Sequence, residues 1–135
     1  MVTVIYGGQG SGKTAKLVQN ANAAALTAKG VVVYIDKGKG RMHDLDHAVK
    51  LVSAEEYNIS ALEQLTAFIK GMVAGNYDIE TLFIDNAEKI TKRELNELSS
   101  LFENLDHISK TFKVNFVLTV NCESENLPHF VRKYI

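Results

Sequence analysis

The 135-residue sequence is poor in the residues that mark several classes of protein. Its one cysteine, Cys122, excludes an intrachain disulfide and a zinc site made of cysteines alone, and it fits a reducing cytoplasm. The sequence has one proline and no Pro-rich, Ser-rich or repetitive stretch that could act as a linker. We therefore expect a single domain over residues 1–135.

Neither charge of one sign nor a long apolar run dominates the sequence. Fifteen Lys and Arg balance sixteen Asp and Glu, so the charge gives no support for a nucleic-acid partner. The longest apolar runs, such as residues 31–35, are far shorter than the ~20 residues that span a bilayer. No basic stretch precedes the first apolar run, so we expect no signal peptide, no membrane partner and a cytoplasmic location.

Short apolar segments rich in β-branched residues alternate with segments of helical periodicity. The predicted strands are residues 2–6, 31–35, 49–52, 81–84 and 114–120, with 49–52 as a short extra strand. The predicted helices are residues 13–29, a helix that closes at Gly75, a helix that carries Leu95 to Ile108 on one face, and residues 126–135. This alternation predicts an α/β fold, with a mostly parallel sheet of about four to five strands and helices on both faces.

Local signals predict where these helices begin and end. Gly30 follows the first helix, where a C-cap glycine is expected. Residues 60–63 and 91–94 each match the capping-box pattern, in which two side chains bond each other's main-chain N–H groups. Residues 36–46 contain few apolar positions and are predicted to form a loop.

Residues 7–14 match the motif G-x-x-x-x-G-K-[ST] at every fixed position, between a predicted strand and a predicted helix. Glycines let successive main-chain N–H groups point into one cavity, and the positive end of the following helix attracts phosphate. Lys13 is expected to reach the β- and γ-phosphates, and the Thr14 hydroxyl to ligate Mg²⁺. The predicted nucleotide-binding residues are Gly7, Gly8, Gln9, Gly10, Ser11, Gly12, Lys13 and Thr14.

With this loop, the strand ends TLFID (residues 81–85) and FVLTVN (residues 116–121) resemble the P-loop NTPases, in particular the RecA-like and AAA+ branch. The order of elements resembles that branch over most of the chain, and the whole is similar to small single-domain bacterial ATP-binding proteins. The resemblance implies ATP and Mg²⁺ as cofactors. It also implies a homo-oligomer or a protein partner, because ATPases of this type usually place ATP between subunits.

Asp85 ends an apolar strand and resembles the Walker B aspartate, which orients the water shell of the magnesium ion. The catalytic glutamate of these families is absent from both of its usual positions, because Asn86 follows Asp85 and residues 36–40 contain no glutamate. Glu88 is our favoured substitute as catalytic base, Asp36 is the second, and the third alternative is no dedicated base. Slow or partner-dependent hydrolysis is therefore expected.

The segment after the fourth long strand and two arginines complete the candidate site. Asn121 resembles the sensor residue that touches the γ-phosphate, which implies that its strand lies between the P-loop strand and the Asp85 strand; an asparagine opening a loop is the alternative. Arg41 and Arg132 are candidates for an arginine finger, with ordinary surface charge as the alternative reading.

Three functions remain open. The first is a weak or partner-activated ATPase, and the second a non-hydrolysing ATP-binding switch. The third is a nucleoside-kinase-like phosphotransferase, since residues 84–87 resemble the Ile-Asp-Glu-Ala string of the thymidine-kinase type. That family also has a cysteine zinc ribbon and a substrate lasso after the sheet, which we do not expect in a sequence that has one cysteine and ends at Ile135. GTP is disfavoured, because residues 91–94 are the nearest string to the guanine-reading Asn/Thr-Lys-x-Asp motif and lack its aspartate.

Overall fold

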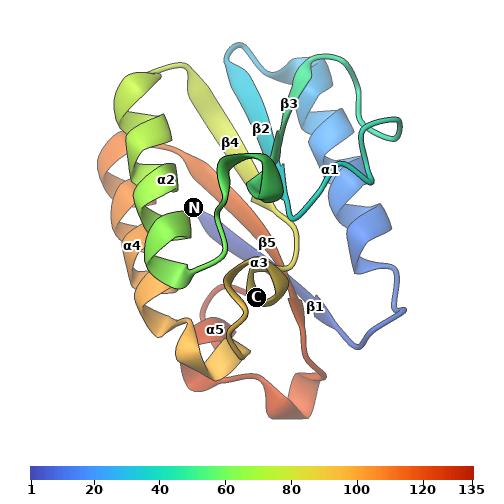
Figure 1. The fold of residues 1–135 in the computed structure, drawn as a ribbon, viewed down its shortest axis with the longest axis vertical. Helices are drawn as coiled ribbons and strands as arrows, with labels where there is room; N and C mark the ends of the chain where they lie inside the picture. Colours follow the sequence, from blue (N-terminus) through green and yellow to red (C-terminus); the bar gives the residue numbers. More distant parts are fainter.

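The computed structural model describes residues 1–135, in which five strands form one sheet with only parallel neighbours. The strands are β1 Val2–Gly7, β2 Val31–Asp36, β3 Val49–Ser53, β4 Ile79–Ile84 and β5 Asn115–Asn121. Their order across the sheet is β1-β5-β4-β2-β3 (Figure 1). The predicted α/β fold class is confirmed, and β5 lies between β1 and β4 as the resemblance implied.

The helices lie on both sides of this sheet. They are α1 Lys13–Thr27, α2 Leu62–Gly75, α3 Ala87–Thr91, α4 Ser99–Phe112 and α5 His129–Arg132. Short 3₁₀ turns occur at η1 Ala54–Tyr57, η2 Leu95–Glu97 and η3 Ser124–Asn126. Figure 1 shows α1 on one side, with α2 and α4 side by side on the other. None of these helices has the length and apolar character that crossing a lipid bilayer requires.

The two faces of the sheet bury unequal hydrophobic clusters. The face under α2 to α5 holds a cluster of 28 buried residues, whereas the α1 face holds one of 7. Strand β2 serves both, because successive side chains of a strand point to opposite faces. Val33 and Ile35 join the larger cluster, and Val32 and Tyr34 join the smaller one. This two-sided burial explains the continuous apolar run of β2.

The first helix ends earlier than its sequence predicts. Helix α1 stops at Thr27, and its C-cap is Ala28, whose N–H donates to the carbonyl of Ala24 over 2.9 Å. Gly30 is therefore not a cap. A Cβ atom at Gly30 would collide with the main-chain oxygen of Asp78, just before β4. The glycine permits close approach of two chain segments at the amino edge of the sheet.

Two other predicted helix starts differ from the structure. The capping box at residues 60–63 does not form, because the N–H of Ser60 donates to the side-chain oxygen of Gln64 over 2.8 Å. The helix predicted over residues 126–135 is limited to the single turn of α5, which follows Pro128 as its N-cap. Both signals lie near a real helix start, but the local hydrogen bonds place that start elsewhere.

The capping box predicted at residues 91–94 is also wrong. Thr91 is buried as the last residue of α3, and its hydroxyl donates to the carbonyl of Ala87 over 2.8 Å. The box forms three residues later, where the N–H of Glu94 donates to the carboxylate of Glu97 over 3.1 Å. The short helix α3 thus separates Asp85 from the long helix α4.

Candidate functional site

The loop after β1 is rich in glycine, and the space around its glycines Gly10 and Gly12 is open. Gly10 and Gly12 have φ angles of 80° and 87°, in the left-handed region that glycine adopts without strain. No atom lies within 4 Å of where a Cβ would stand at either residue. The loop closes with the N–H of Ser11 donating to the carbonyl of Gly8 over 3.2 Å, and α1 begins at Lys13. The main chain therefore leaves room above the start of α1 for a ligand.

Two contacts fix the mouth of this loop. The Lys13 ammonium donates to the carbonyl of Gly8 over 2.8 Å, so the side chain folds back across the loop. The N–H of Cys122 donates to the carbonyl of Gly7 over 3.0 Å, which ties the loop to the segment after β5. The cation at the loop therefore has only a neutral carbonyl as its hydrogen-bond partner.

Asp85 follows β4 and is held by three hydroxyl groups from three other elements. Thr119 and Thr14 donate to its Oδ1 atom over 2.8 Å and 3.3 Å, and Tyr34 donates to its Oδ2 atom over 3.1 Å. Asp85 is 5% exposed. Burial, and then the neighbouring carboxylate of Asp85, raise the pKa of the Tyr34 hydroxyl far above its ordinary value. Tyr34 therefore remains a hydrogen-bond donor at any physiological pH.

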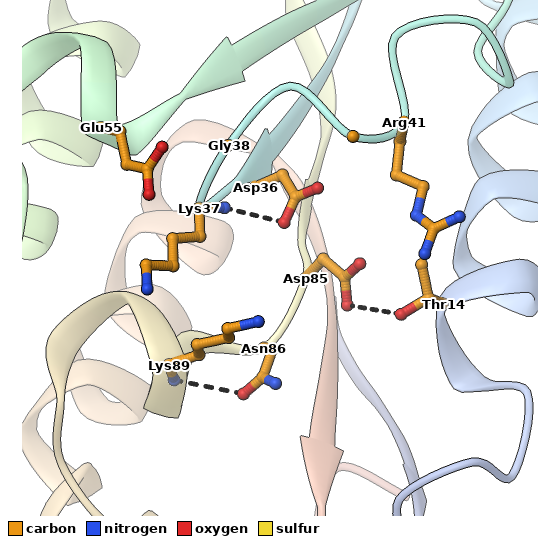
Figure 2. Close-up of a pocket in the computed structure, with 10 residues that line it drawn as sticks. Thr14, Asp36, Lys37, Gly38, Arg41, Glu55, Asp85, Asn86 and Lys89 are labelled. Carbon is orange, nitrogen blue, oxygen red and sulfur yellow. Dashed lines mark hydrogen bonds between the residues drawn. The ribbon is translucent and has the colours of Figure 1, made fainter.

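A polar pocket of about 370 Å³ opens beside Thr14 and Asp85 at the carboxyl edge of the sheet (Figure 2). None of its ten lining residues is hydrophobic. They are Thr14, Asp36, Lys37, Gly38, Gly40, Arg41, Glu55, Asp85, Asn86 and Lys89. Ligands of open α/β sheets bind outside the carboxyl ends of the strands, which is where this pocket lies.

The structure brings Asp36 to this pocket. It ends β2, which pairs with β4, and Figure 2 shows its carboxylate beside that of Asp85. The N–H of Lys37 donates to Asp36 over 2.7 Å. Burial raises the pKa of the Asp36 carboxyl above its ordinary value, the N–H of Lys37 opposes this rise, and the charge of Asp85 adds to it.

Glu88 lies outside this pocket and faces the end of β5. Its Oε2 atom accepts from the N–H of Asn121 over 3.1 Å, and its Oε1 atom is buried without a hydrogen-bond partner. Burial raises the pKa of the Glu88 carboxyl, whereas the N–H of Asn121 and the charge of Lys13 lower it. Glu88 therefore lies near Lys13 and Asn121, whereas Asp36 lies in the pocket that Asp85 lines.

The remaining predicted residues are divided between the site and the surface. Asn121 ends β5 opposite Gly7 of β1. Arg41 lines the pocket near Thr14 (Figure 2), whereas Arg132 donates to the carbonyl of Ser124 and does not line it. Asn86 lies in the pocket wall with a φ angle of 57° and caps α3, accepting from the N–H of Lys89 over 3.2 Å.

The sequence analysis missed Tyr34 and Thr119, which hold Asp85 from the two strands that flank β4. Both are polar side chains within strands that are otherwise apolar on the buried side. A hydroxyl at such a position needs a buried hydrogen-bond partner, so each of these residues indicates that a polar group lies nearby in the interior. The strand order, which shows that the partner is Asp85, was needed to use it.

A family model described as an AAA domain matches residues 1–126. The chain belongs to this family, and with its five-stranded parallel sheet it is a P-loop NTPase of the AAA/RecA-like type. Among solved structures it is similar to the flagellar accessory protein FlaH from Methanocaldococcus jannaschii, with 13% identity and a TM-score of 0.59. That match covers 98% of this chain and 65% of that one, so the chain spans less than two thirds of FlaH. No curated protein matches the sequence significantly.

Proposed function

We propose that this protein binds ATP together with Mg²⁺ and is a weak or partner-activated ATPase. The single observation that carries the proposal is the bond between Thr14 and Asp85, which joins the end of the phosphate loop to the end of β4 over 3.3 Å. In this proposal Gly7 to Thr14 surround the phosphates with main-chain N–H groups, and Lys13 exchanges the carbonyl of Gly8 for phosphate oxygens.

The donor set beside the loop fits magnesium. The Thr14 hydroxyl and the Asp85 carboxylate are hard oxygen donors, and Mg²⁺ is usually held by one or two such groups plus water and phosphate oxygens. Bound magnesium would neutralise charge on the phosphates. Thr119 and Tyr34 keep the Asp85 carboxylate oriented, so its position does not depend on the nucleotide.

For hydrolysis, we propose Glu88 as the base and Asn121 as the group that senses the γ-phosphate. The buried Oε1 atom of Glu88 has no hydrogen-bond partner and is free to accept a hydrogen bond from water. The positive charge of Lys13 is close enough to lower the pKa of the Glu88 carboxyl. Asn86 occupies the position of the usual glutamate but is committed to capping α3. Turnover by the isolated protein should therefore be slow.

Calorimetric titration with Mg-ATP tests nucleotide binding. Lys13→Ala should lower the ATP affinity by about 100-fold or more, because a cation that bonds two phosphates contributes ~1.5–3 kcal/mol per bond. Lys16→Ala, an exposed lysine one turn along α1, is the matched control and should leave the affinity unchanged. An unchanged affinity in folded Lys13→Ala would refute the proposal.

Single-turnover hydrolysis tests the base. Loss of a positioned base typically costs ~10²–10⁴-fold, so Glu88→Gln should reduce the rate by about 100-fold, while Asp36→Asn should change it less. The reverse order would assign the base to Asp36. Equal rates in wild type and both variants would mean that neither carboxylate abstracts the proton.

A second candidate function is a non-hydrolysing switch that binds a protein partner or a second copy of the chain when ATP is bound. The commitment of Asn86 to the N-cap of α3 favours it, since no carboxylate follows Asp85 directly. ATP binding without single-turnover hydrolysis, together with an ATP-dependent change in sedimentation, would establish this function. We also propose that residues 1–135 act as one nucleotide-binding domain in the cytoplasm.

A further inference from the structure

A polar trough extends from the Asp85 pocket away from the phosphate loop. The pocket beside Asp85 shares Lys37 and Glu55 with a neighbouring pocket of about 340 Å³. The second pocket is lined by Lys37, Glu55, Asn58, Ile59, Ser60, Ile90 and Lys92. Neither Thr14 nor Asp85 contributes to it, so a triphosphate on the loop would leave it open. The trough therefore offers space that the proposed nucleotide and its metal do not need.

Three lysines of the trough have no ion-pair partner. Lys37 comes from the end of β2, Lys89 from α3, and Lys92 from the residue that follows α3. The four ion pairs of the molecule all involve other cations. In Figure 2, Lys37 extends away from Asp85 towards α3 and lies below Glu55. Lys37 lines both pockets, Lys89 lines only the pocket beside Asp85 and Lys92 only the second pocket, so the second pocket has two unpaired cations, which attract anions.

The wall that carries Lys37 is tied to η1, and the second pocket also offers uncharged hydrogen-bonding groups. The N–H of Glu55 donates to the carbonyl of Lys37 over 3.0 Å, which joins η1 to the loop after β2. The Glu55 carboxylate forms no ion pair and reaches to 3.4 Å from where a Cβ would stand at Gly38. Asn58 and Ser60 add an amide and a hydroxyl. Such groups are suited to the hydroxyls of a small ligand.

We propose that the trough is a second ligand site, for a small phosphorylated molecule that carries hydroxyl groups. Lys37 and Lys92 bind its phosphate as point charges, and Glu55 accepts hydrogen bonds from its hydroxyls. Lys89 lines only the pocket beside Asp85 and is not part of the proposed phosphate contact. The proposal deepens the proposed function, since it places this ligand next to bound ATP, but it does not require that ATP be hydrolysed.

Amide NMR of the labelled full chain tests the second site. The protein is first saturated with Mg²⁺ and the non-hydrolysable analogue AMP-PNP, so that the phosphate loop is filled, and then titrated with glycerol 3-phosphate. We expect saturable shifts at Gly38, Asn58 and Ser60, with a dissociation constant on the order of millimolar. Inorganic phosphate alone should bind severalfold more weakly, and glycerol alone should give no saturable shift.

Variants separate this site from general attraction of anions. Lys37→Gln and Lys92→Gln should each weaken the binding of glycerol 3-phosphate at least threefold, and Lys70→Gln, an exposed lysine on α2, should not. No saturable shift, or equal weakening by Lys70→Gln, would overturn the proposal. AMP-PNP loading is followed separately at Gly10 and Gly12. If the loading fails, ATP binding is refuted, and the same titration of the nucleotide-free protein still decides the second site.

Discussion

The phosphate loop and the Asp85 cluster meet at Thr14, yet they are built in opposite ways. The loop is rich in glycine and exposed at residues 9–12, and its shape comes from glycine φ angles of 80° and 87°. The Asp85 cluster is buried and made of side chains, with hydroxyls of Tyr34 and Thr119 arriving from neighbouring strands. The loop is therefore sensitive to backbone conformation, and the cluster to charge and hydrogen bonding.

This difference separates two kinds of preorganisation. Main-chain N–H groups in a loop can move when a ligand arrives, and Lys13 must change its partner for phosphate to bind. Asp85 already accepts hydrogen bonds from three hydroxyl groups. Orienting its carboxylate when a ligand binds should therefore cost little free energy. We expect the loop to determine nucleotide affinity and the cluster to determine metal dependence.

Asp85→Asn should break the cluster with the largest effect. The substitution removes the negative charge of Asp85. It also places an NH₂ group, which can only donate, opposite a hydroxyl that donates to the carboxylate in the wild type. Because hydrogen bonds to charged groups contribute ~1.5–3 kcal/mol, the ratio of ATP affinities with and without Mg²⁺ should fall about tenfold to hundredfold. Titration calorimetry with and without EDTA measures that ratio. Asp106→Asn, which breaks the surface pair with Lys110, is the control, and a ratio that stays at the wild-type value would remove Asp85 from the metal site.

Gly12→Ala should break the loop without touching the cluster. No atom lies near the added methyl group, so the expected effect comes from the φ angle of 87°, a conformation that costs other residues ~1–2 kcal/mol. The free energy of unfolding should fall by about 1 kcal/mol, and ATP should bind about tenfold more weakly while the Mg²⁺ ratio is kept. Gly71→Ala, inside α2 and equally uncrowded, should instead stabilise the protein by ~0.5–1 kcal/mol. Equal behaviour of the two variants would contradict the strain argument.

Tyr34→Phe should sharpen the comparison with a smaller effect. The variant leaves Oδ2 of Asp85 without its donor, while Oδ1 keeps Thr14 and Thr119. A bond to a charged group contributes ~1.5–3 kcal/mol, but Oδ1 keeps two donors and only part of this should be lost in metal binding. The Mg²⁺ ratio should therefore fall by about fivefold, and the affinity for free ATP should not change. Tyr57→Phe, at an exposed tyrosine, is the control. A loss of affinity for free ATP in Tyr34→Phe would show that the two regions are coupled.

Apart from its effect on the hydrolysis rate, Glu88→Gln should change the free energy of unfolding, and this change should be the smallest of the four. Because burial raises the pKa of Glu88 above 4.5, the folded protein holds this proton more tightly than the unfolded chain. The contribution is favourable below that value and is lost as the pH rises through the raised pKa. The variant should therefore be more stable than wild type at neutral pH and equal to it at about pH 4. Urea unfolding at both pH values measures this, with Glu103→Gln as an exposed control. A variant less stable than wild type at neutral pH would contradict this account.

Most of the sheet could be predicted from the sequence, because buried strands are local and strongly apolar. The strands and the context of Gly7 to Thr14 agree with the structure for this reason. The exact helix starts could not be predicted, because residues 60–63 and 91–94 carry cap patterns that compete with nearby bonds such as that from Ser60 to Gln64. The partners of Asp85 could not be predicted either, because Thr119 and Tyr34 are brought to it only by the strand order.

The thin cover of α1 over its face of the sheet has a consequence for local unfolding. Only Leu17, Val18 and Ala21 of this helix are buried, whereas α2 and α4 share the larger cluster. Few buried contacts mean a low free energy of opening, so the amides of α1 should exchange with solvent hydrogen sooner than those of α4. A ligand at 100 times its dissociation constant stabilises the bound form by ~2.7 kcal/mol. Since α1 begins at the phosphate loop, much of this stabilisation should appear as slower hydrogen exchange of the α1 amides. Bound nucleotide would then protect α1 in the way that a larger buried cluster protects α4.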